Sequence, residues 1–297
     1  MSKALLDVPS VDRIAIAAGR AIDPALAGVL RELRVVWNRA LWANGAAELE
    51  SHRSRGLPLL ARARERGAAA GVWASPCGIG LEWDDVRSFS GSIGVHYATQ
   101  DGRPVVVKAA REPADELAAA DLARRLGLSA PALWTLDAAE VAGSPADGSG
   151  REVLLVADRV EGFDIRNAPL AGWRLDPSDT AALEALGEIA AFDVAIGNHD
   201  RFRSGNTGNL MIAAEGLVAI DNEGSFSPEP AEVWRRFREP DSTAREIGAY
   251  FGVDLDAAAT RAIATGMGRL ASKLEAIAGA PDLDERAARA IRTVLRA

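Results

Sequence analysis

The sequence predicts an α+β protein, with helices near both ends of the chain and strands in the middle. Residues 23–42 carry apolar side chains at steps of three and four, the spacing of a helix with one buried face. Residues 103–108, Arg-Pro-Val-Val-Val-Lys, follow a Gln-Asp-Gly turn and have the composition of a strand. Four later segments begin at or near Ser, Asp or Pro, residues that favour helix starts, and predict a helical C-terminal part: residues 229–238, 242–251, 256–277 and 284–297.

The composition limits the size and the class of the protein. Its 297 residues, 48% of them hydrophobic, suffice for one two-lobed enzyme or for two small domains. A net charge of −8 argues against a nucleic-acid partner or an anionic membrane surface. The first residues lack the apolar core of a signal peptide, and no run approaches the roughly 20 apolar residues that span a bilayer. We therefore expect a cytoplasmic protein without membrane insertion. The excess of Ala, and of Arg over Lys, indicates a bacterial source.

The first 75 or so residues predict two helices. In the first of them, Trp37 and Trp42 are expected to anchor a core, with a substrate or partner surface as the alternative. The second helix carries five arginines, for which a solvated basic face is expected and docking of an acidic peptide or a phosphorylated ligand is the alternative: Arg53, Arg55, Arg62, Arg64 and Arg66.

A turn of small residues precedes the strand that ends at Lys108. Its glycines would let the backbone approach a phosphate closely and its serines would donate hydrogen bonds, although a plain hairpin is the alternative: Ser90, Gly91, Ser92 and Gly94. Lys108 should be partly buried, and it is conspicuous because the chain has only two other lysines. It is either a phosphate contact or a lysine that extends from the strand to solvent.

A helix is expected at residues 112–127, because Pro and acidic residues begin this segment and Gly follows it. Glu116 lies in its first turns and would pair with Lys108, with Glu112 and Asp115 as competitors. Acidic residues that only complement the helix dipole are the alternative. Two more strands are expected within residues 131–158, followed by a linking segment at 159–164.

Three polar residues predict a phosphoryl-transfer site. A helix at residues 180–195 leads to Asp200, and residues 209–214 and 217–221 predict two strands joined by a turn at 215–216. This hairpin would bring Asn209 and Asp221 together, where their oxygens suit Mg²⁺. Asp200 would orient the acceptor. A polar loop beside an ordinary hairpin is the alternative.

In this order the motifs resemble atypical members of the protein-kinase-like superfamily, namely actin-fragmin kinase, the HipA-type kinases and the phosphatidylinositol 3- and 4-kinases. The resemblance covers about residues 84–225 and is strongest at residues 197–201 and 208–211. It implies a two-lobed fold with a helical extension at residues 1–80, a small β-rich N-lobe at 81–162 and a helical C-lobe at 163–297.

The same resemblance implies roles for individual residues. It makes Asp200 the catalytic aspartate, Asn209 and Asp221 the metal ligands, and Lys108 the phosphate lysine with Glu116 as its partner. Arg201 would steady the loop through a carboxylate or a phosphate. Adenine would bind at residues 158–161, which include Glu161, and Asp164 would contact the ribose.

The chain departs from the family pattern at three points. Asn209 lies nine residues after Asp200, whereas kinases more often place this Asn about five residues on, so Asn206 is a rival ligand. Asp221-Asn222-Glu223 stands in place of Asp-Phe-Gly, and Glu223 is a candidate for an extra metal or substrate contact. No Ala-Pro-Glu segment follows, so we expect no regulation by phosphorylation of an activation loop.

We therefore expect a kinase that uses ATP and Mg²⁺ to transfer the γ-phosphate to a hydroxyl acceptor. A protein Ser or Thr is favoured as the acceptor. The alternatives are an antibiotic or metabolite as the acceptor, transfer of AMP on the same fold, and a nucleotide-binding scaffold without turnover.

Overall fold

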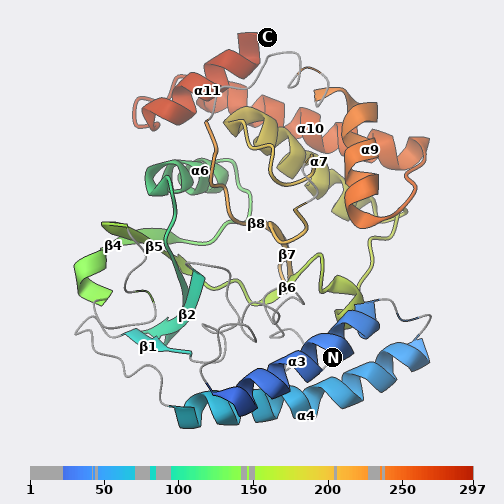
Figure 1. Ribbon diagram of the computed structural model, residues 1–297. Helices are drawn as coiled ribbons and strands as arrows, with labels where there is room; N and C mark the ends of the chain where they lie inside the picture. Colours follow the sequence, from blue (N-terminus) through green and yellow to red (C-terminus); the bar gives the residue numbers. More distant parts are fainter. Residues whose placement is uncertain are drawn as a thin grey trace. The chain divides into compact units, whose positions relative to one another are not determined.

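The structure is a computed structural model that describes residues 23–41, 43, 46–70, 81–84, 95–141, 146, 151–203, 206–226, 235 and 238–296 (Figure 1). The chain divides into two compact units. The first comprises Met1–Arg111, Ala132–Phe163 and Asn167–Gly172, and the second comprises Glu112–Pro131, Asp164–Arg166 and Trp173–Ala297. Helices and antiparallel sheets occur together, which confirms the predicted α+β class.

Two long helices begin the described part of the first unit, as the sequence predicts: α3 (Pro24–Leu41) and α4 (Ala46–Ala70). The Asp23 carboxylate accepts a hydrogen bond from the Ala25 amide at 2.9 Å and so caps the start of α3. Trp37 is 1% exposed and lies in the core between the two helices, which confirms its role as an anchor. A Cβ at Gly56 of α4 would lie 1.2 Å from the Trp37 ring, so the close packing requires glycine there. Trp42 lies outside the described residues.

The first unit also contains a five-stranded sheet in which every neighbouring pair of strands is antiparallel. Its order is β1 (Leu81–Trp83), β2 (Val95–Gln100), β3 (Arg103–Lys108), β5 (Val153–Asp158) and β4 (Leu133–Asp137). A short 3₁₀ helix, η1 (Ala138–Val141), follows β4, and another, η2 (Ala168–Ala171), packs near α3.

The hairpin formed by β2 and β3 confirms the predicted turn before Lys108. Asp101 and Gly102 have φ values of 50° and 79°, as a two-residue turn with left-handed residues requires. Val105 and Val107 are fully buried on one face of β3, and Lys108 is half-buried, as predicted. The glycine and serine residues at 90, 91, 92 and 94 lie outside the described residues.

The second unit is mainly helical, and its helices follow the predicted segments: α6 (Pro113–Arg125), α7 (Thr180–Ile196), α9 (Pro240–Phe251), α10 (Ala257–Ile277) and α11 (Glu285–Arg296). Side chains from four of them form one core, which includes Leu122, Phe192, Leu270 and Ile291. Most of the helix predicted at residues 229–238 lies outside the described residues.

Helices α7 and α10 cross with their backbones almost in contact. A Cβ at Gly187 would lie 2.1 Å from the Ile263 carbonyl oxygen, and one at Gly266 would lie 1.9 Å from the Glu184 carbonyl oxygen. Only glycine permits this approach, because real Cβ atoms essentially never come within 3.0 Å of another heavy atom. The crossing fixes the position of α7, whose C-terminal end leads to the candidate site.

A small sheet with the order β6-β7-β8 completes the fold, from β6 (Gly162–Asp164), β7 (Leu210–Ala213) and β8 (Gly216–Ala219). Strands β7 and β8 form the predicted hairpin, and Leu210 pairs with Ala219 at its open end. The turn lies at residues 214–215, one residue earlier than predicted, because Gly216 already pairs with Ala213. Among the described residues, none of the helices combines the length and the apolar character that a membrane span requires.

Candidate active site

Asp200 lies in a loop whose course is fixed by the end of α7. Gly197 caps the C-terminal end of the helix with a left-handed φ of 72°, and the Asn198 amide donates to the Asp193 carbonyl at 2.8 Å. The Asn198 side chain then accepts a hydrogen bond from the Asp200 amide at 2.9 Å. Side-chain bonds of this kind are typical of tight Asn turns. The backbone of Asp200 is therefore held three residues after the helix cap.

Two amide groups orient the carboxylate of Asp200. Its Oδ2 accepts hydrogen bonds from Asn206 Nδ2 at 2.9 Å and from Asn209 Nδ2 at 3.1 Å. Asp200 is half-buried, whereas Asn209 is only 4% exposed. The structure thus brings the predicted aspartate together with both of its candidate asparagines.

Arg201 connects this loop to the residues next to the open end of the β7–β8 hairpin. Its side chain is 0% exposed, and its Nε donates to the Asn209 carbonyl at 2.9 Å. Its Nη2 donates to the Ile220 carbonyl at 3.1 Å and to Asn222 Oδ1 at 2.9 Å. The planar guanidinium presents several donors in a fixed geometry, which suits a group that must bind several acceptors at once. Arg201 therefore links the loop of Asp200 to residues on either side of Asp221.

The remaining partner of Arg201 is the carboxylate of Asp193 in α7. Burial raises the pKa of Asp193 to about 6, although the positive charge of Arg201 opposes this shift. The carboxylate is thus ionised at neutral pH and forms a buried ion pair. Asn198 Nδ2 adds a longer hydrogen bond of 3.4 Å to Asn222 Oδ1.

Asp193, Asn198 and Asn222 are site residues that were not predicted from the sequence. Asp193 had a detectable signal, because it is a charged residue within the apolar run Ile-Ala-Ala-Phe-Asp-Val-Ala-Ile of α7. Buried charges are usually paired, so such a residue indicates a partner elsewhere in the fold. Asn198 and Asn222 are polar loop residues with no distinguishing pattern.

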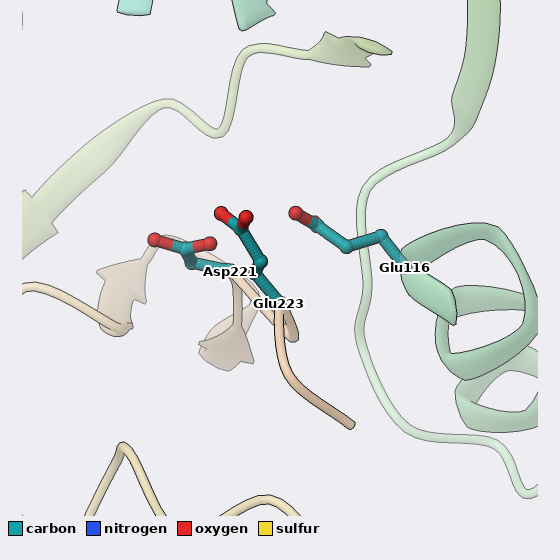
Figure 2. A group of neighbouring side chains, drawn as sticks. All are labelled: Glu116, Asp221 and Glu223. Carbon is teal, nitrogen blue, oxygen red and sulfur yellow. The ribbon is translucent and has the colours of Figure 1, made fainter. Parts of the chain in front are cut away.

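Three carboxylates come together beside the end of β8. Glu116, Asp221 and Glu223 each offer one oxygen, and these oxygens lie within 4.8 Å of one another. Figure 2 shows Glu116 extending from α6 toward the other two, which follow β8. Glu116 is 3% exposed, whereas Asp221 is exposed. Asp221 has a φ of 56°, a left-handed value that Asp tolerates better than most residues.

This set of donors fits a hard divalent cation. It contains only oxygen atoms, which Mg²⁺ prefers, and it contains neither imidazole nor thiolate, which softer metals favour. Carboxylates at this separation repel one another, and a cation would offset that repulsion. Glu223 thus lies near the predicted ligand Asp221, where the sequence made it a candidate for an additional contact.

The loop after Asp200 is also held from its other side. The hydroxyl of Tyr250, on α9, donates to the Asn206 carbonyl at 3.1 Å. Arg166 Nε donates to Thr207 Oγ1 at 3.3 Å. These three side chains were not predicted from the sequence, because their partners lie far along the chain.

The remaining predicted residues are divided between the two units. Lys108 and Glu161 belong to the first unit, where Glu161 is exposed. Glu116 belongs to the second unit, so its pairing with Lys108 stays a prediction. Asp164 is buried at the end of β6, and its contact with ribose also stays a prediction.

No family model matches the chain, and no curated protein matches its sequence. One similar solved structure is that of the Helicobacter pylori proinflammatory kinase CtkA, which has 12% sequence identity and a TM-score of 0.34. The match covers 68% of this chain and 88% of CtkA. A TM-score this low does not establish a shared fold.

Proposed function

We propose that the protein is a phosphotransferase that uses ATP and Mg²⁺ to transfer the γ-phosphate to a hydroxyl acceptor. One observation carries this proposal: the carboxylate of Asp200 is hydrogen-bonded to Asn209, and Arg201 ties this pair to the residues that flank Asp221. Phosphoryl transfer needs an aspartate for the acceptor and oxygen ligands for the metal in a fixed arrangement, because catalysis depends on positioning and charge neutralisation.

The hydrogen bonds support a separate role for each residue. Asp200 would accept or orient the proton of the acceptor hydroxyl, with its carboxylate held by the two amides. Asp221 and Asn209 would hold Mg²⁺, which neutralises the charge of the phosphate groups. Glu116 and Glu223 lie close enough to Asp221 to add ligand oxygens or to bind the water molecules of the metal.

The nucleotide contacts of the proposal come from the sequence resemblance. Lys108 would neutralise phosphate charge, the serine and glycine residues at 90–94 would cover the phosphates, and Glu161 and Asp164 would lie near adenine and ribose. A protein Ser or Thr is the favoured acceptor, and a small molecule is the alternative.

Transfer from ATP labelled on the γ- or the α-phosphate tests the proposal. The protein is incubated with Mg²⁺ and either a panel of protein acceptors or a panel of hydroxylated small molecules. Transfer of the γ-label supports a kinase, whereas transfer of the α-label alone replaces it with AMP transfer. Binding of ATP without transfer of either label would leave a nucleotide-binding scaffold and contradict the proposal.

Two substitutions connect any observed activity to the site. Asp200→Asn keeps an oxygen that can accept from the two asparagines but removes the charge, and it should abolish transfer. Asp254→Asn makes the same chemical change at an exposed aspartate after α9, and it should leave transfer unchanged.

A further inference from the structure

The hydrogen bonds of Asn206 use both ends of its side-chain amide within the protein. Its Nδ2 donates to Asp200 Oδ2 at 2.9 Å, and its Oδ1 accepts from the Gly208 amide at 3.3 Å. Its backbone carbonyl accepts from the Asn209 amide at 3.1 Å and from the Tyr250 hydroxyl at 3.1 Å. The oxygen that Asn206 would offer to a metal is therefore already used by its own loop.

Asn209 has the opposite arrangement. Its Nδ2 donates to the same oxygen of Asp200, but within the described part of the chain no hydrogen bond reaches its Oδ1. Its backbone is fixed on both sides, because its carbonyl accepts from Arg201 Nε at 2.9 Å and from the Ile220 amide at 3.1 Å. Asn209 thus keeps a rigidly held oxygen for an external ligand.

Tyr250 is well suited to hold Asn206 in place. It is 7% exposed, and its ring packs edge-to-face against Phe202 at a centroid distance of 5.1 Å. Burial raises the pKa of its hydroxyl further above the ordinary value, so the group stays a hydrogen-bond donor at any working pH. Packing of the ring limits its motion, so the hydroxyl remains directed at the loop.

We propose that Asn206 is a positioning residue that orients Asp200 and is itself held by Tyr250, while Asn209 alone supplies the amide oxygen for the metal. This inference rests on the proposed function, and it decides between the two asparagines that the sequence leaves as rivals. Neither Asn206 nor Tyr250 needs to touch the substrate in this arrangement, because both act through the orientation of one carboxylate.

The kinetic test uses Asn206→Ala, Tyr250→Phe and Asn209→Ala, with Tyr97→Phe as a control at the only other tyrosine of the chain. Asn206→Ala should lower kcat about ten-fold, because it removes the hydrogen bond to the Asp200 carboxylate and the one from the Gly208 amide. Tyr250→Phe should lower kcat about five-fold, because it removes the one hydrogen bond that holds the Asn206 carbonyl from α9. KM for ATP and the Mg²⁺ concentration at half-maximal rate should stay unchanged. Asn209→Ala should raise that Mg²⁺ concentration.

The double variant tests whether Tyr250 acts through Asn206. Once the Asn206 side chain is gone, loss of the Tyr250 hydroxyl should lower kcat little further, so the two effects should not multiply. Fully multiplicative effects would overturn the inference. A raised Mg²⁺ requirement in Asn206→Ala with none in Asn209→Ala would also overturn it, because the roles would then be exchanged.

Hydrogen exchange provides a measurement that needs no activity. The amides of Gly208 and Asn209 both donate to Asn206, so their exchange should be faster in Tyr250→Phe and in Asn206→Ala than in the wild type or in Tyr97→Phe. Unchanged exchange in both variants would refute the positioning role. If the wild type transferred no phosphate, the proposed function would fail, and exchange would still decide whether Tyr250 and Asn206 hold the loop.

Discussion

Substitution of Gly266 by Ala tests the close crossing of α7 and α10. The added Cβ would lie 1.9 Å from the Glu184 carbonyl oxygen, and a distance under 3.0 Å essentially never occurs for real Cβ atoms. The helices must therefore separate by at least about 1 Å locally, since the obstructing atom belongs to the backbone.

The expected cost follows from two opposing effects. Overpacking of this kind destabilises by about 1–3 kcal/mol. Replacement of Gly by Ala within a helix contributes up to about 1 kcal/mol in the other direction. We expect a net loss of about 1–2 kcal/mol in the free energy of unfolding.

Gly268 provides a matched control in the same helix. It is exposed, and a Cβ there would meet no atom within 4 Å, so Gly268→Ala should stabilise by up to about 1 kcal/mol. Urea denaturation followed by circular dichroism measures both variants against the wild type. If Gly266→Ala were as stable as Gly268→Ala, the described crossing of the helices would be wrong.

Two further predictions concern other buried contacts. Gly56→Ala should destabilise the first unit by about 1–3 kcal/mol, because its Cβ would overlap the Trp37 ring. Gly28→Ala in α3 should not destabilise it, because a Cβ there would meet no atom within 4 Å, and thermal unfolding compares the two variants. The pKa of Asp193 is raised from 3.8 to about 6 in the folded protein, so between these pH values the folded state keeps a proton that the unfolded chain releases. The contribution of this group to stability therefore falls by on the order of 3 kcal/mol as the pH rises from about 4 to about 6. Asp193→Asn lacks this titration, so the unfolding free energy of the variant minus that of the wild type should rise by that amount as the pH rises from about 4 to about 6. Parallel pH profiles of unfolding free energy for the two proteins would contradict the raised pKa.

The sequence predicts most of the local structure because its signals are local. Helix α7 and the hairpin of β7 and β8 are each specified by periodicity and by capping or turn residues within a short segment. Asp179 caps α7 through a hydrogen bond of 3.0 Å from the Ala182 amide, and Asp256 caps α10 in the same way from two amides at 2.8 Å. Such signals can be read from the sequence without knowledge of the tertiary fold.

The connections between site residues are not predictable in this way. Arg201 forms hydrogen bonds to residues 8 to 21 positions away, and Tyr250 on α9 forms one to Asn206, 44 positions away. These contacts depend on the path of the loops, including a left-handed conformation at Asp221 that periodicity does not reveal. The sequence therefore identified Asp200, Asn209 and Asp221 as candidates, but not the buried side chains that hold them.

We propose that Asp200 promotes phosphoryl transfer but is not needed for nucleotide binding. A single-turnover assay of γ-phosphate transfer compares the wild type with Asp200→Asn at saturating ATP and Mg²⁺, while ATP affinity is measured separately. We expect a rate for Asp200→Asn that is lower by about 100-fold or more, since a positioned acid or base contributes at least that much, and an unchanged ATP affinity. A rate within a few-fold of the wild type would contradict the assignment of Asp200.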